Sequence, residues 1–240
     1  MPQRLMISVV IPTLDAEAGL GRTLAALVPA AVEGLVREVV VVDGGSADRT
    51  LEIADAAGAD ILRAGRGRGL QLRAGAGRAR FPWLLFLHAD TELERGWERE
   101  AAQLIERVDC GQRGLTAAVF RFTLDDVGLA PRALETGVLL RTAVLKLPYG
   151  DQGLLIPRRL YDQIGGYAAL PVMEDVDIVR RLGRRRLVAL RSRALTSAAR
   201  YRKDGYVRRV LVNQACLMLY LCRVPAERIA RLYAPRRAVS

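Results

Sequence analysis

The first 90 residues alternate between short continuous apolar runs and stretches in which apolar residues recur at helical spacing. Continuous apolar runs of about four to eight residues are typical of strands buried on both faces. This alternation predicts an α/β fold with a mostly parallel central sheet that helices cover on both faces. The predicted strands are residues 5–12, 36–42, 61–62 and 81–87. The predicted helices are 16–28, 48–57 and one that begins within 65–77, and the first of them stops at Pro29.

Beyond residue 109 the pattern is less regular. Residues 117–124 alternate in a way that predicts a strand exposed on one side. The remaining predicted elements are helices at 129–147, 157–164, 174–182 and 206–222, a turn and strand within 150–156, a strand at 188–190, and a short basic helix after Pro225.

Length and composition favour one large domain, or one domain with a sizeable C-terminal appendage. Hydrophobic residues make up 51% of the 240 residues, which is enough for a packed core. The first four residues lead directly into an apolar strand, so we expect no secretory signal. The three cysteines, Cys110, Cys216 and Cys222, lack metal-ligand spacing and favour a reduced, cytoplasmic protein.

Positive charge is concentrated near the end of the chain. Residues 178–240 hold 17 Lys and Arg against 2 Asp and Glu, a balance of +15, so the net charge of +11 leaves −4 for residues 1–177. A basic tail on a nearly neutral body suits an anionic partner such as a lipid headgroup, a phosphorylated substrate or nucleic acid. Solvated arginine without a specific partner is the simpler alternative.

The apolar-rich segment 206–222 is too short to span a bilayer, which takes about 20 apolar residues. Asn213 and Gln214 also interrupt it. With basic residues just upstream, the segment suits a position at a membrane interface or over a substrate site. Packing on the sheet domain or at a homodimer contact explains it equally well.

Polar residues directly follow three of the predicted strands. Pro12 and Thr13 end the first strand, Asp43 ends the second, and His88-Ala-Asp90 follows the fourth. The carboxyl ends of parallel strands meet at one edge of a sheet, where open α/β sheets bind ligands. These scattered residues are therefore predicted to share one site.

His88 is the only histidine of the chain, and Asp90 follows it by two residues. An imidazole and a carboxylate at a strand exit suit a divalent metal that itself holds a phosphate. The alternative is that Asp90 caps a helix beginning at Thr91 while His88 only packs.

Asp43 opens the segment Asp43-Gly-Gly-Ser46, whose small residues let the backbone approach a ligand closely. A carboxylate at this position can accept a hydrogen bond from a base or a ribose hydroxyl. Capping of the next helix by Ser46 or Asp48 is an alternative that is compatible with the first interpretation.

Residues 65–75 are rich in glycine and arginine and follow the third strand, not the first. Their position argues against the glycine loop of a dehydrogenase. Arginine beside glycine suits direct binding of a diphosphate. The alternative is that the segment is an ordinary basic surface loop.

Glu174 and Asp175 stand at the start of a predicted helix. The helix dipole keeps a carboxylate ionised there, so that it can act as a base. Acidic first turns are also common helix signals, which explains the pair without any chemistry.

Residues 9–17, 41–50, 88–90 and 173–177 occur in the order and at the separations of one known family. Together they resemble the family-2 glycosyltransferases, which have the Rossmann-like GT-A fold of nucleotide-diphospho-sugar transferases, over about residues 5–190. Residues 150–153 and 170–176 look more like the small bacterial branch often labelled arsenosugar-biosynthesis-type.

The resemblance implies a role for each matching residue. Asp175 corresponds to the base that deprotonates the acceptor hydroxyl, with Glu174 beside it. Asp90 matches the last residue of the D-x-D metal motif, and His88 its first. The residues that correspond to the donor site are Pro12, Thr13, Glu17, Asp43, Gly45, Ser46, Arg66, Arg68, Gln71 and Ala89.

The implied reaction is a metal-dependent, inverting transfer from a nucleoside-diphosphate sugar to the hydroxyl of a small-molecule or lipid-linked acceptor. Mg²⁺ or Mn²⁺ with arginine would neutralise the leaving group, and the base would activate the hydroxyl. The chain departs from the family pattern at His88, which replaces a carboxylate, and at Asp15, which replaces an asparagine. The Q-x-x-R-W motif of processive synthases is absent, so we expect transfer of a single sugar.

We expect residues 1–195 to form the catalytic domain and residues 196–240 a basic helical extension packed on it. The expected location is the cytoplasm, with peripheral contact at the inner face of the membrane. A nucleotidyltransferase is one alternative, but residues 12–19 lack the lysine or arginine that it needs. A nucleic-acid-binding protein is another, but aromatics make up only 5% of the chain, so no nucleic acid partner is expected.

Overall fold

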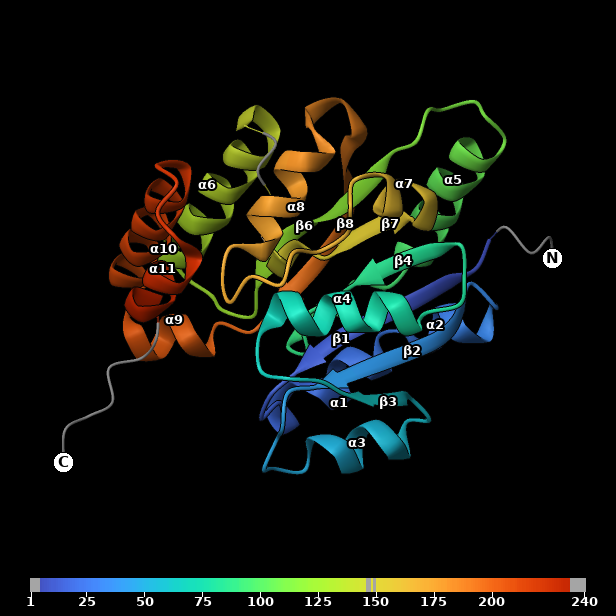
Figure 1. Cartoon of the computed structure of the whole chain (residues 1–240), viewed down its shortest axis with the longest axis horizontal. Helices are drawn as coiled ribbons and strands as arrows, with labels where there is room; N and C mark the ends of the chain where they lie inside the picture. Colours follow the sequence, from blue (N-terminus) through green and yellow to red (C-terminus); the bar gives the residue numbers. More distant parts are fainter. Residues whose placement is uncertain (1–4, 146–147, 149, 234–240) are drawn as a thin grey trace.

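Within the residues that the computed structural model describes, 5–145, 148 and 150–233, a single sheet of eight strands has helices on both faces (Figure 1). The strand order across the sheet is β3-β2-β1-β4-β7-β6-β8-β5. The strands are β1 Ile7–Thr13, β2 Val36–Asp43, β3 Asp60–Arg63, β4 Trp83–Phe86, β5 Thr91–Leu93, β6 Ala117–Leu124, β7 Leu154–Pro157 and β8 Leu187–Thr196.

Parallel pairs predominate in this sheet. β1 pairs in parallel with β2 and β4, β2 with β3, and β6 with β8. β7 runs antiparallel to β4 and β6, and β5 runs antiparallel to β8. The prediction of an α/β fold with a mostly parallel sheet is confirmed.

The helices divide into those that cover the sheet and those at the end of the chain. Two 3₁₀ turns, Gly150–Gln152 and Arg184–Arg186, precede β7 and β8. The α-helices are α1 Glu17–Ala25, α2 Val28–Val32, α3 Thr50–Ala56, α4 Arg68–Arg78, α5 Trp97–Asp109, α6 Leu129–Leu145, α7 Arg158–Gln163, α8 Glu174–Leu182, α9 Ala199–Asp204, α10 Tyr206–Leu221 and α11 Ala226–Tyr233.

The core lies on both faces of the sheet. Val9 and Ile11 of β1 belong to one buried cluster, which includes Trp97 of α5. Val10, between them, belongs to a second cluster with Leu72 of α4. Successive side chains of a strand point to opposite faces, so a strand covered on both sides needs apolar residues at every position. This explains why the continuous apolar runs identified the strands.

Thr91 begins a strand and not a helix, so the alternative in which Asp90 caps a helix at Thr91 is wrong. Thr91 pairs with Thr196 of β8, and the two hydroxyls lie 3.2 Å apart. Thr91 and Leu93 are buried while Glu92 between them is partly exposed. This alternation spans only three residues, too few to be distinguished from an acidic first turn.

Two other strands differ from their predictions. Residues 117–124 are buried except for Arg121, so the predicted exposure of one side is wrong. Ala118 and Phe120 belong to the buried cluster with Trp97, whereas Ala117 and Val119 belong to the cluster on the other face of the sheet. β8 covers ten residues instead of the predicted three, because its exposed arginines, Arg191 and Arg193, conceal the strand pattern.

Pro29 does not mark the end of one long helix. α1 ends at Ala25, and Pro29 lies in the first turn of the short helix α2. A proline costs no hydrogen bond in that turn, because its missing N–H would have no partner there.

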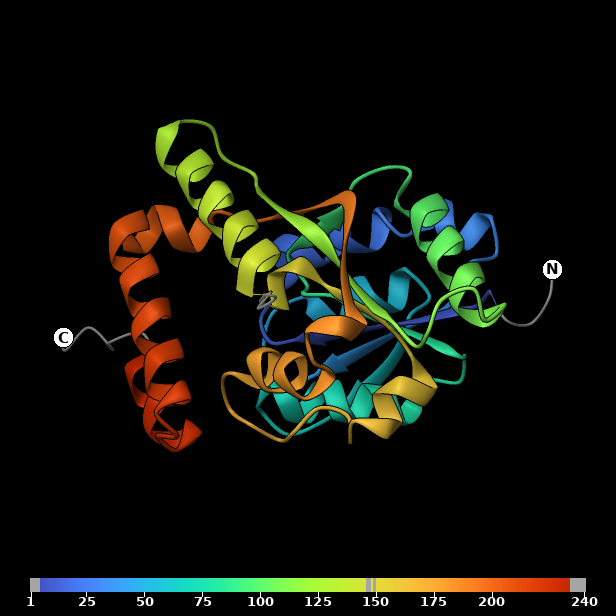
Figure 2. The same ribbon diagram turned by 90° about the horizontal axis from the view of Figure 1, so that it is seen from above.

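Helices α9, α10 and α11 lie together at one end of the molecule (Figure 2). They follow β8, which ends at Thr196, one residue after the predicted domain boundary. The predicted helix 129–147 corresponds to α6, although residues 146–147 lie outside the described part of the chain. None of the described helices is both long and apolar enough to cross a membrane.

Candidate functional site

The carboxyl ends of β1 and β2 are joined directly. The N–H of Gly44 donates to the carbonyl of Thr13 at 2.9 Å, and the Thr13 hydroxyl donates to the carboxylate of Asp43 at 3.2 Å. Leu87, after β4, donates to the carbonyl of Val10 at 3.1 Å. The predicted polar residues of these three strands therefore meet at one edge of the sheet.

Asp43 is 1% exposed, and its carboxylate accepts hydrogen bonds from the protein itself. One oxygen accepts the N–H groups of Gly45 and Ser46 at 2.9 and 3.0 Å, and the other accepts the hydroxyls of Ser46 and Thr13. Burial acts to raise the pKa of Asp43, but these hydrogen bonds outweigh it and lower that pKa. Gly45 has a φ of 95°, which a residue with a side chain rarely adopts. Asp43 thus holds a tight turn at the strand end.

The loops after β1 and β2 are tied together by reciprocal hydrogen bonds. Asp15 donates its N–H to the Ser46 hydroxyl at 2.9 Å, and its carboxylate accepts the N–H of Ala47 at 2.8 Å. The carboxylate of Glu17 accepts the N–H of Arg49 at 3.1 Å. Glu17 is exposed, and Pro12 is partly exposed at the end of β1.

Asp48 completes this connection and also bonds the start of α3. Its carboxylate accepts the N–H of Glu17 at 3.0 Å and the N–H of Thr50, the first residue of α3, also at 3.0 Å. The capping alternative considered for Asp48 is therefore confirmed, and it coexists with the turn that Asp43 builds.

Gln71 is buried on α4 and serves the framework of the site. Its amide nitrogen donates to the carbonyls of Thr13 and Val42, each at 2.8 Å. Both are backbone groups at the ends of β1 and β2. Gln71 therefore fixes the two strand ends from helix α4, and its role in donor binding stays a prediction.

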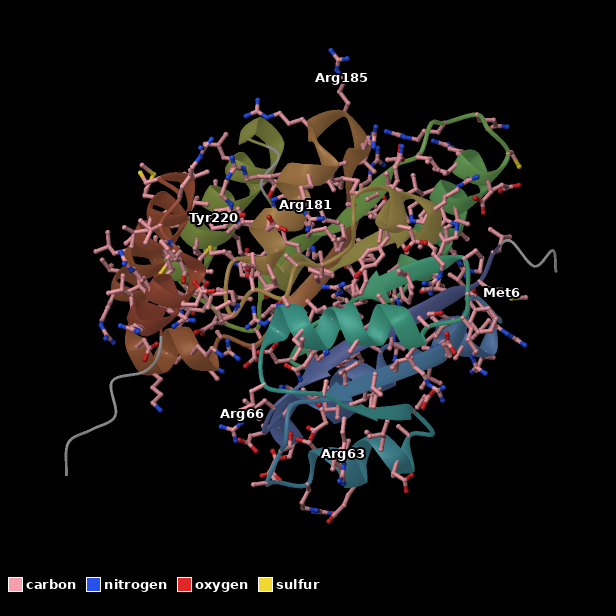
Figure 3. All side chains as sticks on the ribbon, viewed as in Figure 1. Met6, Arg63, Arg66, Arg181, Arg185 and Tyr220 are labelled. Atoms are coloured by element: carbon pink, nitrogen blue, oxygen red, sulfur yellow. The ribbon has the colours of Figure 1, made fainter. Side chains whose placement is uncertain are left out.

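The two arginines of the glycine-rich loop lie in different surroundings. Arg66 is exposed and projects into solvent at the same end of the sheet as the loops after β1 and β2 (Figure 3). Arg68 is the first residue of α4, and its guanidinium lies 3.3 Å from the carboxylate of Glu174 on α8. This ion pair joins the start of α4 to the acidic start of α8.

His88-Ala-Asp90 is held in place by α1, a contact that the sequence did not predict. The Thr23 hydroxyl donates to the carbonyl of Ala89 at 2.9 Å. A Cβ on Gly19 would lie 2.8 Å from the same carbonyl oxygen, so only glycine allows this approach. Gly19 and Thr23, four residues apart on one face of α1, form the signal in the sequence.

His88 is partly buried, and its imidazole faces the segment that begins at Gly150. A Cβ on Gly150 would lie 2.7 Å from Nε2 of His88. Burial, together with the charges of Arg68 and Arg200, holds the pKa of His88 well below its ordinary value. The ring is therefore neutral near pH 7.

Asp90 offers the carboxylate best placed for a cation. No hydrogen bond or ion pair engages its side chain within the described residues, and Mg²⁺ and Mn²⁺ prefer such hard oxygen ligands. The described residues contain no group of three or more His, Cys, Asp and Glu arranged around a metal position. Asp90 thus fits an ion whose remaining ligands are phosphate oxygens and water.

Glu174 and Asp175 lie in the first turn of α8 as predicted, but their surroundings differ. Glu174 is 2% exposed, and burial and the charge of Asp175 raise its pKa to about 7 against the opposing charge of Arg68. Asp175 is partly exposed. Its carboxylate accepts the N–H groups of Gly150 at 2.7 Å and Val176 at 2.8 Å.

Asp151 is a further acidic residue of the site that sequence reasoning did not select. Its Oδ1 atom is buried and accepts no hydrogen bond. Burial, with the charges of Asp175 and Asp90, raises the pKa of Asp151 to about 6, although Arg141 acts against this. The sequence signal for Asp151 is the segment 150–153, which otherwise contributes only to the resemblance to the small bacterial branch.

A small pocket brings these groups together. Its polar lining comes from His88, Gly150, Glu174 and Asp175, and its floor is apolar. The other lining residues are Leu72, Phe86, Leu87, Val119, Pro148, Gly153, Leu154, Tyr167, Ile178 and Val179. The end of β4 and the start of α8 therefore face a common space.

Solved structures of similar fold include complexes with UDP and UDP-GlcNAc. Glucosyl-3-phosphoglycerate synthase from Mycobacterium tuberculosis, in complex with Mn²⁺, UDP and glucosyl-3-phosphoglycerate, is 22% identical with a TM-score of 0.57, over 92% of this chain and 81% of that one. TarS from S. aureus in complex with UDP-GlcNAc is 18% identical with a TM-score of 0.61, over 80% of this chain and 58% of that one. These identities establish a shared fold only.

A mycobacterial protein is 24% identical with a TM-score of 0.54, over 80% of this chain and 65% of that one. The chain thus covers less than two thirds of the length of the first structures that it matches. No curated protein matches the sequence, and the narrower resemblance to the arsenosugar-biosynthesis-type branch stays a prediction.

The family comparison is more specific than the likeness in fold. The description of the matching family is glycosyl transferase family 2, and the match spans residues 8–170, more than half of the chain. This span includes the turn at Asp43, the loop with Arg66 and Arg68, and the strand exit at His88-Ala-Asp90. The GT-A fold and the ordered motifs agree with it, and the chain belongs to glycosyl transferase family 2.

Proposed function

We propose that this protein transfers a single sugar from a nucleoside-diphosphate sugar to an acceptor hydroxyl, with inversion at the anomeric carbon. The observation that carries the proposal is the convergence of three strand exits with the acidic first turn of α8. Membership of glycosyl transferase family 2 supports the reaction class. Complexes of structural neighbours with UDP and UDP-GlcNAc support a nucleotide-sugar donor.

The donor nucleotide is assigned to the edge formed by the loops after β1, β2 and β3. Asp43 acts there by shaping the turn at Gly45 and Ser46, since its own carboxylate already accepts four hydrogen bonds. Arg66 is positioned to meet the diphosphate. The remaining proposed donor-site residues are Pro12, Thr13, Glu17, Arg68, Gln71 and Ala89.

A divalent cation is assigned to Asp90. Mg²⁺ or Mn²⁺ bound there would supply positive charge to the diphosphate leaving group. His88 remains a proposed neighbour of that ion, and its neutral ring is chemically suited to ligation. Its Nε2 faces Gly150, however, so Asp90 is the stronger candidate.

Asp175 is the proposed base. A base must reach the acceptor hydroxyl, and Asp175 is partly exposed whereas Glu174 is 2% exposed and paired with Arg68. The hydrogen bond from Gly150 orients the Asp175 carboxylate. Glu174 would then hold Arg68 in place. The acceptor is a small-molecule or lipid-linked compound with a free hydroxyl.

The test combines a variant at Asp90 with a panel of nucleoside diphosphates. Mn²⁺ and the preferred nucleoside diphosphate should together raise the melting temperature of the wild-type protein, because both bind only the folded state. Asp90→Ala should abolish transfer and remove the Mn²⁺-dependent part of this increase.

Glu33→Ala is the matched control, because Glu33 is an exposed carboxylate at the end of α2. It should behave as the wild type in both assays. Full Mn²⁺-dependent stabilisation of the Asp90→Ala protein would place the metal elsewhere, and no stabilisation of the wild type by any nucleoside diphosphate would contradict the proposed donor class.

A further inference from the structure

Helix α10 carries a stripe of exposed apolar side chains. Val207 is 74% exposed, Leu211 64%, Met218 58% and Leu221 40%. Their separations of four, seven and three residues place them on one face of the helix. We call these four residues the α10 stripe. Large apolar side chains that gather on one exposed face mark an interaction surface.

The opposite face of α10 is already occupied within the chain. Cys216 and Leu217 are buried, and the Tyr220 hydroxyl donates to the carboxylate of Asp177 on α8 at 3.0 Å. The guanidinium of Arg180 lies 5.7 Å from the centre of the Tyr220 ring. Figure 3 shows Tyr220 on the side of α10 near α8. The α10 stripe is therefore the face of the helix that stays exposed when the other face packs against the rest of the described chain.

The α10 stripe is surrounded by positive charge. Exposed cations precede it at Lys203, adjoin it at Arg208 and follow it at Arg223 and Arg228. Residues 178–240 hold 17 Lys and Arg against 2 Asp and Glu. A helix with an apolar face and flanking cations suits the surface of an anionic bilayer, where apolar side chains enter the headgroup boundary and cations meet phosphates.

We propose that the α10 stripe docks on an anionic lipid membrane surface, with the helix lying in the plane of the interface. A second copy of the chain is a poorer occupant, because a two-fold contact brings the same patch from both subunits together and sets their cations against each other. The inference depends on the stripe and its charges, and it is independent of the proposed transferase activity.

The test is co-sedimentation of the full chain with vesicles. Wild-type protein should sediment with vesicles of phosphatidylcholine and phosphatidylglycerol at low salt, and should be released as salt screens the charges. Vesicles of phosphatidylcholine alone should retain much less protein. A Leu211→Glu, Met218→Glu double variant should bind the anionic vesicles at least about tenfold more weakly, because the change removes apolar contact and adds negative charge.

Val32→Glu is the matched control, since Val32 is 82% exposed on α2 and lies outside the stripe. It should bind as the wild type does, and circular dichroism should show that both variants are folded. Equal binding of wild type and double variant, or no binding at low salt, would overturn the proposal. A wild-type dimer that the double variant abolishes in sedimentation equilibrium would also overturn it, because the stripe would then be a subunit contact.

Discussion

Two groups of carboxylates meet at the site, and their pKa values are shifted in opposite directions. Burial acts to raise the pKa of Asp43 and Asp48, but hydrogen bonds from neighbouring N–H groups and hydroxyls outweigh it and lower both pKa values. Glu174 and Asp151 have too few donors to offset burial. Their pKa values are raised to about 7 and about 6.

The difference separates carboxylates whose charge many hydrogen bonds stabilise from carboxylates that are buried with few hydrogen-bond donors. Asp43 and Asp48 close the loops after β1 and β2, so their negative charge is stabilised by the fold. Ionisation of Glu174 and of Asp151 costs free energy, because burial disfavours the charged carboxylate. Residues with pKa values perturbed in this way gather at functional sites. Asp175, beside Glu174, is partly exposed and accepts two backbone N–H groups.

The largest effect is expected at Asp175. Asp175→Asn keeps the size of the side chain and much of its hydrogen bonding but removes its basicity. Transfer should fall by at least about 10²-fold, the lower end of general-base contributions, while affinity for the nucleoside diphosphate stays nearly unchanged. Initial rates and titration calorimetry on the same protein would measure both.

Glu174→Gln is the companion variant, because it tests which of the two neighbours is the base. If Asp175→Asn remains active and Glu174→Gln does not, the roles are exchanged. Normal transfer by both variants would leave the pair as the acidic first turn of α8 and would remove the proposed base from the mechanism.

The sequence predicted the regions in which local pattern and tertiary environment agree. β1 and β2 are covered on both faces, so most of their positions are apolar, and the polar residues at their carboxyl ends are conspicuous. The start of α8 was equally clear from Glu174 and Asp175. β5 was missed because three residues are too few for a pattern. The close approach of α1 to Ala89 was missed because it depends on Gly19 and on contacts between distant segments.

Asp151 shows a second reason why the sequence alone could not predict the whole site. Its properties come from burial and from the charges of Asp175, Asp90 and Arg141, which lie on other elements. Nothing in the local sequence reports how many hydrogen-bond donors a carboxylate will find after folding. The same limit applies to Asp43, whose role in donor binding stays a prediction and whose four internal hydrogen bonds could not be foreseen.

A smaller effect is expected at Asp43. Asp43→Ala leaves the N–H groups of Gly45 and Ser46 without their acceptor, so the turn loosens. Affinity for the nucleoside diphosphate should weaken by roughly 1–3 kcal/mol, the usual cost of losing a charged hydrogen bond. Calorimetry would measure it. Asp60→Ala, on β3, is the control, and unchanged affinity in the Asp43 variant would separate the turn from nucleotide binding.

The smallest effect concerns the dependence of folding stability on pH. The folded protein holds the proton of Asp151 more tightly than the unfolded chain does, because the pKa is raised to about 6. The stability that this proton provides is fully present below about pH 4, the ordinary pKa of aspartate, and is lost as the pH rises through about 6.

Asp151→Asn removes this titration, so it tests whether the raised pKa belongs to Asp151. The free energy of unfolding of the variant, relative to wild type, should increase between about pH 4 and about pH 7 and then level off, by roughly 1–3 kcal/mol. Urea denaturation across this range would measure it, with Asp55→Asn on the exposed side of α3 as the control for loss of one charge. Parallel curves for wild type and Asp151→Asn would show that Asp151 ionises without cost, and the contrast with Asp43 would then rest on Glu174 alone.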